Sequence, residues 1–198
     1  MKKEKKRKIC KIYLFRHGQT YYNRDGIFTG FVDSKLTKRG IEDAKIVAER
    51  LKNKKFQVAF HTRLSRSKDT LKQVLKYHPE CTRLIEDDRM LERNYGKLNT
   101  HSHWEIVRKK GPKQYDKWHR GFNIRPPKGE SFADVERRVR AFLKDLFKFV
   151  KKERVDVAIS AHGNSIRLVR KILEKASKEE TVGWFIPYDT YFEYSVKC

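Results

Sequence analysis

The sequence predicts an α/β fold of three layers, α/β/α, in which helices cover both faces of a mainly parallel central sheet. Short apolar runs typical of buried strands alternate along the chain with segments whose apolar residues recur at helical spacing. Two of the apolar runs end in the same dipeptide, His17-Gly18 and His162-Gly163. Polar residues at the carboxyl ends of strands are typical of open parallel sheets, which bind their ligands at that edge.

The length of 198 residues fits one domain with a substantial core. We expect residues 9–198 to form that domain and the basic residues 1–8 to form a flexible tail. The tail has the charge of a secretory signal, but no small-residue cleavage site follows it, so no signal is expected. No run approaches the ~20 apolar residues of a membrane-spanning helix, so no membrane partner is predicted.

The first half of the chain has the clearest alternation of elements. Residues 9–15 are largely apolar, as a central strand should be, and the polar residues 16–18 mark its end. Thr37 is a suitable N-cap for a helix that continues to about Lys52. The remaining elements predicted in this half are a strand at 57–61, a helix at 64–77 and a short extended segment at 83–85.

The second half begins with the least regular segment, residues 86–130, whose glycines and prolines indicate an active-site insertion. Ser131 then begins a long helix with a continuous apolar stripe, and residues 177–180 form the capping box of a short helix. The other elements predicted in this half are a buried strand at 155–161, a helix at 164–174 and an alternating strand at 190–196.

The net charge of +23 is the strongest feature of the composition. Nucleic-acid binding could account for it, because basic surfaces attract phosphate backbones. However, the lysines are spread through every segment, with no zinc-finger spacing, RNP-like aromatic motif or basic heptad helix beside them. We therefore expect solvated lysine-rich faces that concentrate small anionic substrates, and no specific nucleic-acid partner.

The cysteines are few and follow no motif. Cys10, Cys81 and Cys198 show neither a CxxC pair nor another metal-ligand spacing. Their odd number and scattered positions predict unpaired thiols in a reducing cytoplasm.

The two His-Gly pairs are the best candidates for chemistry. In a parallel sheet the ends of both strands lie at one edge, so His17 and His162 can converge although they are far apart in sequence. Neutral imidazole is a competent nucleophile towards phosphorus, and a planar guanidinium such as that of Arg16 or Arg66 binds phosphate oxygens bidentately.

A turn without function and a metal site both compete with phosphoryl chemistry. A single His-Gly at a strand end is usually only a turn, so the phosphoryl hypothesis depends on having two of them, one preceded by arginine. Metal binding is possible in principle because His101 and His103 form an HxH pair. Acidic ligands do not cluster near either His-Gly pair, and the sequence therefore favours a site without metal.

Six motifs in a fixed order carry a resemblance to a known family. They are LFRHGQTYYN (14–23), FTGFVD (28–33) with LTKRG (36–40), TRLSR (62–66), LERNYG (91–96), WHRGF (118–122) with PP (126–127), and AHGNSIR (161–167). Over residues 9–175 the chain resembles the histidine phosphatase superfamily, and within it the cofactor-dependent phosphoglycerate mutases. The resemblance implies a phosphoglycerate mutase-like fold.

The resemblance also implies a role for each matching residue. His17 would be the phosphorylated nucleophile, with Arg16, Arg66 and His162 binding the transferring phosphoryl group. Glu92 would pass protons to and from the substrate hydroxyl. The remaining matches would bind substrate: Asn23, Thr29, Gly30, Gly163 and Asn164 through hydrogen bonds to phosphate, and Tyr95 and Arg120 through the rest of the molecule.

The chain departs from the mutase pattern at two positions. His103 stands where the mutases have a substrate-binding lysine, and His119 replaces the first arginine of an Arg-Arg pair. How the enzyme binds the rest of the substrate, outside the phosphoryl group, is therefore left open. Because arginine and histidine provide the positive charge, no metal is implied.

We expect a cytoplasmic protein and consider three functions for it. The first is a mutase that interconverts 3- and 2-phosphoglycerate, with 2,3-bisphosphoglycerate as the phosphoryl primer. The second is a phosphomonoesterase in which water accepts the phosphoryl group. The third, a basic binding protein without catalysis, is disfavoured by the intact set of catalytic residues. Assembly into a homo-oligomer is left open.

Overall fold

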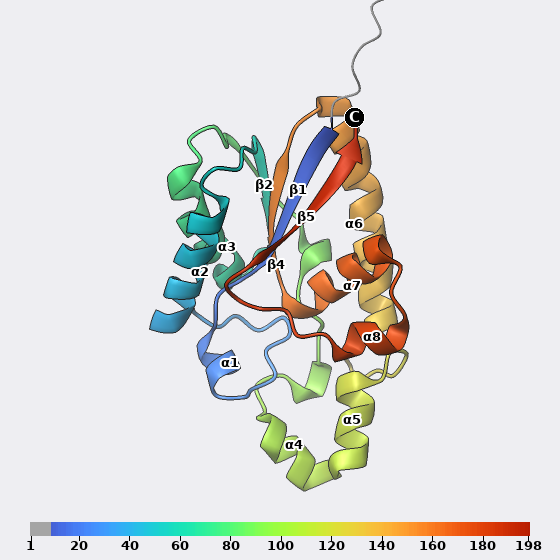
Figure 1. Cartoon of the computed structure of the whole chain (residues 1–198). Coiled ribbons are helices and arrows are strands. Elements are labelled where there is room, and N and C mark those ends of the chain that lie inside the picture. The colour runs from blue at the N-terminus through green and yellow to red at the C-terminus, as the bar shows by residue number, and fades with distance from the viewer. Residues whose placement is uncertain (1–8) are drawn as a thin grey trace, which may run out of the picture.

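The computed structural model describes residues 9–198 as a five-stranded sheet between helices (Figure 1). The order of strands is β3-β2-β4-β1-β5, with β1 parallel to β4 and β2 parallel to both β4 and β3. Only β5 runs antiparallel, along β1 at the edge of the sheet. The strands are β1 (Ile9–Arg16), β2 (Val58–His61), β3 (Arg83–Glu86), β4 (Val157–Ala161) and β5 (Tyr191–Lys197). The mainly parallel three-layer fold is thus confirmed, and the predicted tail 1–8 lies outside the described residues.

Side chains at predicted capping positions begin the larger helices. Thr37 accepts a hydrogen bond from the backbone of Gly40 at the start of α2, and Ser131 forms a capping box with Asp134 at the start of α6. The helices are α1 (Tyr21–Arg24), α2 (Lys38–Leu51), α3 (Ser65–Val74), α4 (His103–Lys110), α5 (Pro112–Arg120), α6 (Phe132–Glu153), α7 (Gly163–Glu174) and α8 (Lys178–Gly183). Short 3-10 turns follow at Leu75–Tyr77, Asp88–Met90 and Gly96–Leu98.

The sheet buries apolar side chains on both faces because successive residues of a strand point to opposite sides. On β1, Ile12 and Leu14 pack with the apolar stripes of α6 and α7. Tyr13 and Phe15, between them in sequence, pack on the other face with α2 and α3. The near-continuous apolar run of this strand follows from burial on both sides.

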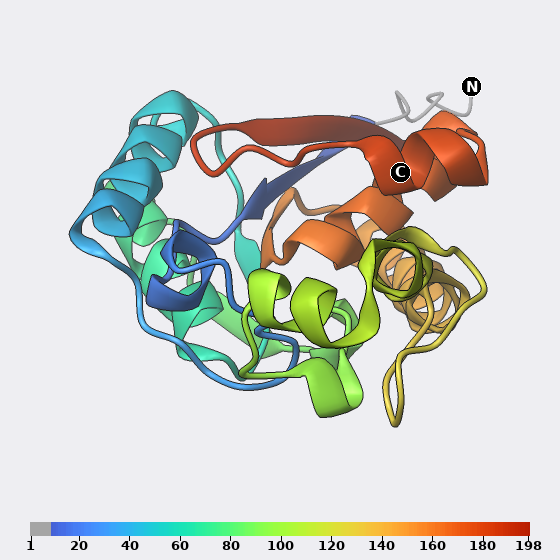
Figure 2. The same cartoon turned by 90° about the horizontal axis from the view of Figure 1, so that it is seen from below.

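The segment 86–130 contains more regular structure than the sequence predicts. It forms α4 and α5, which lie at the end of the molecule where β1, β2 and β4 finish (Figures 1 and 2). The prediction of an irregular segment is therefore wrong over these two helices. These helices are short and bury little, since α4 buries only Ile106 and α5 buries no residue fully.

The cysteines require a second correction. Cys10 and Cys198 are joined by a disulfide, with Cα atoms 6.2 Å apart, and Cys81 is free. The pairing follows from the antiparallel register of β1 and β5, which places Cys10 opposite Val196 and so brings the end of β5 beside the start of β1. The prediction of unpaired thiols is wrong for these two residues, because cysteine spacing does not reveal which strands pair.

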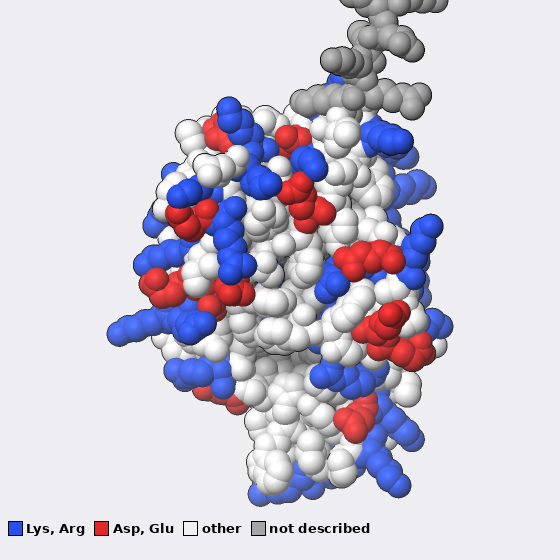
Figure 3. All heavy atoms as spheres, in the orientation of Figure 1, with Lys and Arg blue, Asp and Glu red and all other residues white. Residues whose placement is uncertain are grey.

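The basic side chains are dispersed, as expected. On the face seen in Figure 3, Lys and Arg lie mainly at the top and along both sides, where they are interleaved with Asp and Glu, and the centre of that face is largely uncharged. Across residues 9–198 no helix is long and apolar enough to cross a membrane.

Candidate active site

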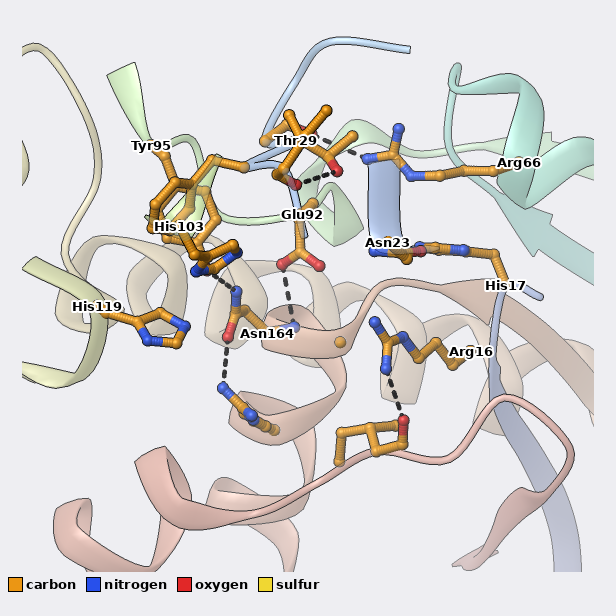
Figure 4. Close-up of a pocket in the computed structure, with 16 residues that line it drawn as sticks. Arg16, His17, Asn23, Thr29, Arg66, Glu92, Tyr95, His103, His119 and Asn164 are labelled. Carbon is orange, nitrogen blue, oxygen red and sulfur yellow. Dashed lines mark hydrogen bonds between the residues drawn. The ribbon is translucent and has the colours of Figure 1, made fainter. Parts of the chain in front are cut away.

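The ends of the parallel strands and the segments beside them line a cavity of about 160 Å³. Every site residue predicted from the sequence lines this cavity except His162 and Arg120. In Figure 4, His17, Arg16, Arg66 and Asn23 lie on one side, and Tyr95, His103 and His119 lie on the other. Glu92, Thr29 and Asn164 lie between the two groups. The residues predicted to handle the phosphoryl group, His17, Arg16 and Arg66, thus lie on one side of the cavity, called here the phosphoryl side, and the opposite wall has a different character.

His17 follows β1 directly and is 2% exposed, so the pocket is its only access to a substrate. Its ring Nδ1 lies 2.8 Å from the carbonyl oxygen of Gly18. Because a carbonyl can only accept, Nδ1 carries the ring proton and Nε2 keeps its lone pair. Burial, followed by the charges of Arg66 and Arg16, lowers the pKa of His17 well below its ordinary value. The ring is therefore a neutral imidazole with a free nucleophilic nitrogen.

Glycine at position 18 is required by close packing behind this nucleophile. A Cβ atom there would lie 2.0 Å from the carbonyl oxygen of Gly40 in the first turn of α2. The backbone N–H of Gly18 donates to Oγ1 of Thr70 on α3, at 3.0 Å. The two helices therefore hold the end of β1 in place.

Arg66, in the first turn of α3, is buried and directed at the phosphoryl side of the cavity. Its Nη1 and Nη2 donate to the carbonyls of Val32 and Gly30, at 2.9 Å each. Burial lowers the pKa of Arg66 to about 10, so the guanidinium keeps its charge at neutral pH. The loop 30–32 thus fixes the orientation of a permanent cation beside His17.

Arg16 reaches the same side of the cavity from the last position of β1. Its Nη1 donates to the carbonyl of Ile186 at 2.8 Å, and the guanidinium carbon lies 4.0 Å from the ring centroid of Tyr188. Its Nε is buried and has no hydrogen-bond partner among residues 9–198. A buried donor without an acceptor is costly, and a bound anion would satisfy it.

His162 stands behind His17, with ring centroids 5.0 Å apart. Its Nδ1 lies 3.3 Å from Nε of Arg66, which can only donate, so Nδ1 accepts and the neutral ring carries its proton on Nε2. That Nε2 donates to Oγ1 of Thr62 at 2.8 Å. Both nitrogens are thus engaged by protein, and His162 orients Arg66. Its predicted direct contact with the phosphoryl group remains a prediction.

Glu92 lies next to the phosphoryl side at the amino end of α7. Its Oε1 accepts from the backbone N–H groups of Arg93 at 2.8 Å and Asn164 at 3.0 Å. Arg138 donates to the backbone carbonyl of Glu92 at 2.9 Å and so fixes the main chain as well. The carboxyl group is held with one oxygen anchored while the side chain lines the cavity.

The opposite wall is aromatic and contains the two histidines that depart from the mutase pattern. His103 stacks on Phe28 with ring centroids 3.9 Å apart, and its Nδ1 lies 2.7 Å from the hydroxyl of Tyr115. His119 meets the His103 ring edge-on at 5.2 Å. Burial and then Arg120 lower the pKa of both rings, that of His119 to about 3. Both histidines are therefore uncharged at neutral pH.

For two arginines, the structure differs from the sequence-based prediction of which residues line the cavity. Arg120 does not line the cavity, and its guanidinium donates to the carbonyl of Val182. Arg167 does line the cavity, although the sequence predicts no role for it. The signal for Arg167 was present, because it ends the AHGNSIR motif one helical turn after Gly163. Phe28 and Ile186 also contribute walls that no motif role indicated.

The residues predicted to form hydrogen bonds with phosphate all line the cavity: Asn23, Thr29, Gly30, Gly163 and Asn164. Asn23 uses its Oδ1 for the Thr20 capping box, which leaves its amide nitrogen as the available donor. Gly163 begins α7, and a Cβ atom there would lie 3.5 Å from the guanidinium carbon of Arg16. Within residues 9–198 no group of three or more His, Cys, Asp or Glu side chains is placed to hold a metal ion.

Relatives resemble this chain in sequence, and solved structures resemble it in fold. The phosphoglycerate mutase of Schizosaccharomyces pombe is 35% identical over 86% of this chain and 82% of that protein. The 2,3-bisphosphoglycerate-dependent phosphoglycerate mutase of Chlamydia muridarum is 31% identical over 89% of each chain. The fold matches a mycobacterial glucosyl-3-phosphoglycerate phosphatase with a TM-score of 0.81 at 22% identity, covering 95% of this chain and 91% of that one. It also matches Bacillus anthracis phosphoglycerate mutase with a TM-score of 0.79 at 19% identity, covering 96% and 89%.

A family model decides the assignment. The model of the histidine phosphatase superfamily (branch 1) matches residues 12–189, which is most of the chain. His17, Arg16, Arg66 and Glu92 lie together in one pocket, as the resemblance implied. The chain therefore belongs to the histidine phosphatase superfamily, whose members transfer or hydrolyse phosphoryl groups.

Proposed function

We propose that this enzyme is a 2,3-bisphosphoglycerate-dependent phosphoglycerate mutase that interconverts 3- and 2-phosphoglycerate in the cytoplasm. The observation that carries the phosphoryl-transfer part is the state of His17, a neutral ring whose Nε2 is free in a pocket lined by two arginines. The choice of phosphoglycerates is supported by relatives of 31% and 35% identity that bear this activity in their names.

The chemistry follows from the residues of the pocket. Nε2 of His17 forms a bond to phosphorus as the bond from phosphorus to the ester oxygen breaks, and Glu92 gives that oxygen a proton. Arg16 and Arg66 balance the negative charge on the phosphoryl oxygens. In the return step the carboxylate of Glu92 takes the proton from the attacking hydroxyl group, and the bond from Nε2 to phosphorus breaks.

The residues present fit 2,3-bisphosphoglycerate as the primer. Arg16 and Arg167 line the same cavity, and each has a buried Nε without a hydrogen-bond partner among residues 9–198. Two such donors suit a ligand with more than one anionic group. Arg16 and Arg66 would hold the group next to His17, and Arg167 another. When bound, the primer supplies the phosphoryl group that charges His17.

A phosphomonoesterase is the second candidate, and the opposite wall favours it. His103 and His119 are neutral, and Arg120 is engaged by a backbone carbonyl. A wall with so little charge holds a bisphosphate weakly, so water can replace the second hydroxyl as the acceptor.

One assay separates the two functions. Purified protein is incubated with 3-phosphoglycerate, with and without 2,3-bisphosphoglycerate, and 2-phosphoglycerate and free phosphate are both measured. A mutase forms 2-phosphoglycerate in a primer-dependent way and in excess of phosphate. Phosphate as the main product would establish the phosphomonoesterase instead.

The nucleophile has its own test. Labelled 2,3-bisphosphoglycerate should give an acid-labile, base-stable phosphoenzyme, because a phosphorus–nitrogen bond is cleaved by acid. His17→Ala should abolish both the label and turnover. Wild-type turnover in His17→Ala would contradict the mechanism for mutase and phosphatase alike.

A further inference from the structure

Arg167 is a cation to which the phosphoryl-transfer steps assign no role beyond holding a second anionic group of the primer. It lies on α7, lines the cavity, and has an Nε that is buried without a hydrogen-bond partner among residues 9–198. None of the ion pairs formed within the described part of the chain includes it. Leaving a partly buried charge unpaired is unfavourable for folding, so its presence indicates a ligand.

The position of Arg167 is fixed relative to the catalytic carboxyl group by Asn164. Nη1 of Arg167 donates to Oδ1 of Asn164 at 2.9 Å, and Nδ2 of Asn164 donates to the hydroxyl of Tyr95 at 3.0 Å. The backbone N–H of the same asparagine donates to Glu92. Asn164 therefore holds both the Glu92 carboxyl group, through its backbone, and the guanidinium of Arg167 on the same helix, through its side chain.

The surroundings of Arg167 restrict the charge that it can neutralise. Among the described residues that line the cavity, Arg16, Arg66 and Arg167 are the arginines, and there is no lysine. Arg16 and Arg66 flank His17, whereas the wall opposite presents neutral His103 and His119. Among the described lining residues away from His17, Arg167 is thus the one guanidinium, while the charge of Arg120 acts on the same wall from outside the lining. One guanidinium in the lining matches a single planar anion such as a carboxylate.

We propose that Arg167, held by Asn164, is the carboxylate-binding residue of this pocket and makes the enzyme selective for phosphate esters of hydroxy acids. A planar guanidinium with a free Nε edge pairs with a planar carboxylate through two parallel hydrogen bonds. This inference deepens the proposed function, since a phosphoglycerate is such an ester. It also applies if water, and not a second hydroxyl group, accepts the phosphoryl group.

A pair of substrates that differ in one group tests the assignment. 3-Phosphoglycerate and glycerol 3-phosphate differ by a carboxylate in place of a hydroxymethyl group, and consumption of each can be followed whatever the product. The wild-type kcat/KM should favour 3-phosphoglycerate by about 100-fold, the usual effect of a buried charge pair. Arg167→Gln should lose most of that preference, and Arg167→Lys should recover only part of it because lysine cannot bind bidentately.

Binding without turnover gives a second measurement. Calorimetry in the His17→Ala background measures the affinity for each compound. Arg167→Gln should weaken the binding of 3-phosphoglycerate by at least tenfold more than it weakens the binding of glycerol 3-phosphate. The matched control is Arg170→Gln on the same helix, whose guanidinium pairs with Glu174 and does not line the cavity. It should leave the substrate preference within twofold of the wild type.

Thermal stability separates a ligand-binding role from a structural one. Because Arg167 has no ion pair to lose, Arg167→Met should melt at the wild-type temperature or above it while losing the preference for 3-phosphoglycerate. A lower melting temperature with the preference kept would show a structural role and overturn the inference. Loss of preference in Arg120→Gln, with Arg167→Gln unaffected, would assign the carboxylate to Arg120 instead. Failure to form 2-phosphoglycerate would refute the mutase but not the carboxylate site.

Discussion

His103 and His119 show how burial decides the charge of a single residue. Histidine at an exposed site gains charge near pH 6.5, and substrate binding at slightly acidic pH would then strengthen. Here burial and Arg120 lower the pKa of both rings, that of His119 to about 3. His119 therefore stays neutral from pH 7.5 down to pH 6, and His103 gains charge less readily than an exposed histidine, so anion binding by this wall should change little in that range.

Replacing both rings by permanent cations tests this conclusion. His103→Lys with His119→Arg should raise the ratio of 2-phosphoglycerate to free phosphate severalfold, because added charge retains a bisphosphate longer. The gain should shrink little between pH 7.5 and pH 6, since His119 is neutral at both and the lowered pKa of His103 makes that ring harder to charge. His101→Lys adds a charge at an exposed residue that does not line the cavity and serves as the control. A gain that disappears at pH 6 would mean that the native rings protonate.

At the scale of elements, the junction of β1 with α2 positions the nucleophile. A Cβ atom on Gly18 would lie 2.0 Å from the carbonyl oxygen of Gly40, so Gly18→Ala must move the end of β1 or the start of α2. We expect a loss of about 2–3 kcal/mol of unfolding free energy from overpacking. We also expect kcat to fall at least tenfold, because small displacements of a reacting group are costly.

Urea unfolding and steady-state kinetics measure the two effects. Gly183→Ala is the matched control, since a Cβ atom there meets no heavy atom within 4 Å. It should change neither stability nor kcat appreciably. If Gly18→Ala behaves like Gly183→Ala, the backbone contact between β1 and α2 does not hold His17 in place.

The sequence predicts elements well where pattern and burial coincide. The strands β1 and β4 and the helices α2, α6 and α7 have strong periodicity because each buries a full face or stripe. The helices α4 and α5 escaped prediction because they bury little, and α5 starts at Pro112 directly after a glycine with positive φ. The disulfide and the antiparallel direction of β5 are long-range features that no local pattern carries.

The candidate site likewise contains residues that the sequence could predict and contacts that it could not. The motifs pointed to His17, Arg16, Arg66 and Glu92, and the structure brings these four residues to one cavity, while their catalytic roles are part of the proposal. The hydrogen bonds of His162 to Thr62 and Arg66, and the diversion of Arg120 to Val182, depend on how side chains meet in three dimensions. Such contacts could not be predicted from spacing.

For the whole molecule, buried neutral histidines make stability depend on pH in a definite window. Burial lowers the pKa of His17 and His162 well below its ordinary value, and that of His119 to about 3. In the unfolded chain the same rings titrate near pH 6.5. Below that pH the unfolded state binds more protons than the folded state, so unfolding becomes more favourable as the pH falls.

The window between pH 6.5 and pH 5 isolates this effect from that of the carboxylates. Asp134 and Glu105 have lowered pKa values, that of Glu105 to about 2, so the stability that they contribute is lost only as the pH falls below about 4.5. Each buried histidine can remove up to about 1.4 kcal/mol per pH unit below pH 6.5. Urea unfolding at pH 7.5, 6.5, 5.8 and 5.0 should therefore give a free energy of unfolding that is constant above pH 6.5 and falls below it.

In His119→Gln the free energy of unfolding should fall less steeply, because one proton-binding group has been removed from the unfolded chain. A wild-type stability that stays level to pH 5 would mean that these rings are protonated in the folded protein, and His17 would then lack the free lone pair on which phosphoryl transfer depends.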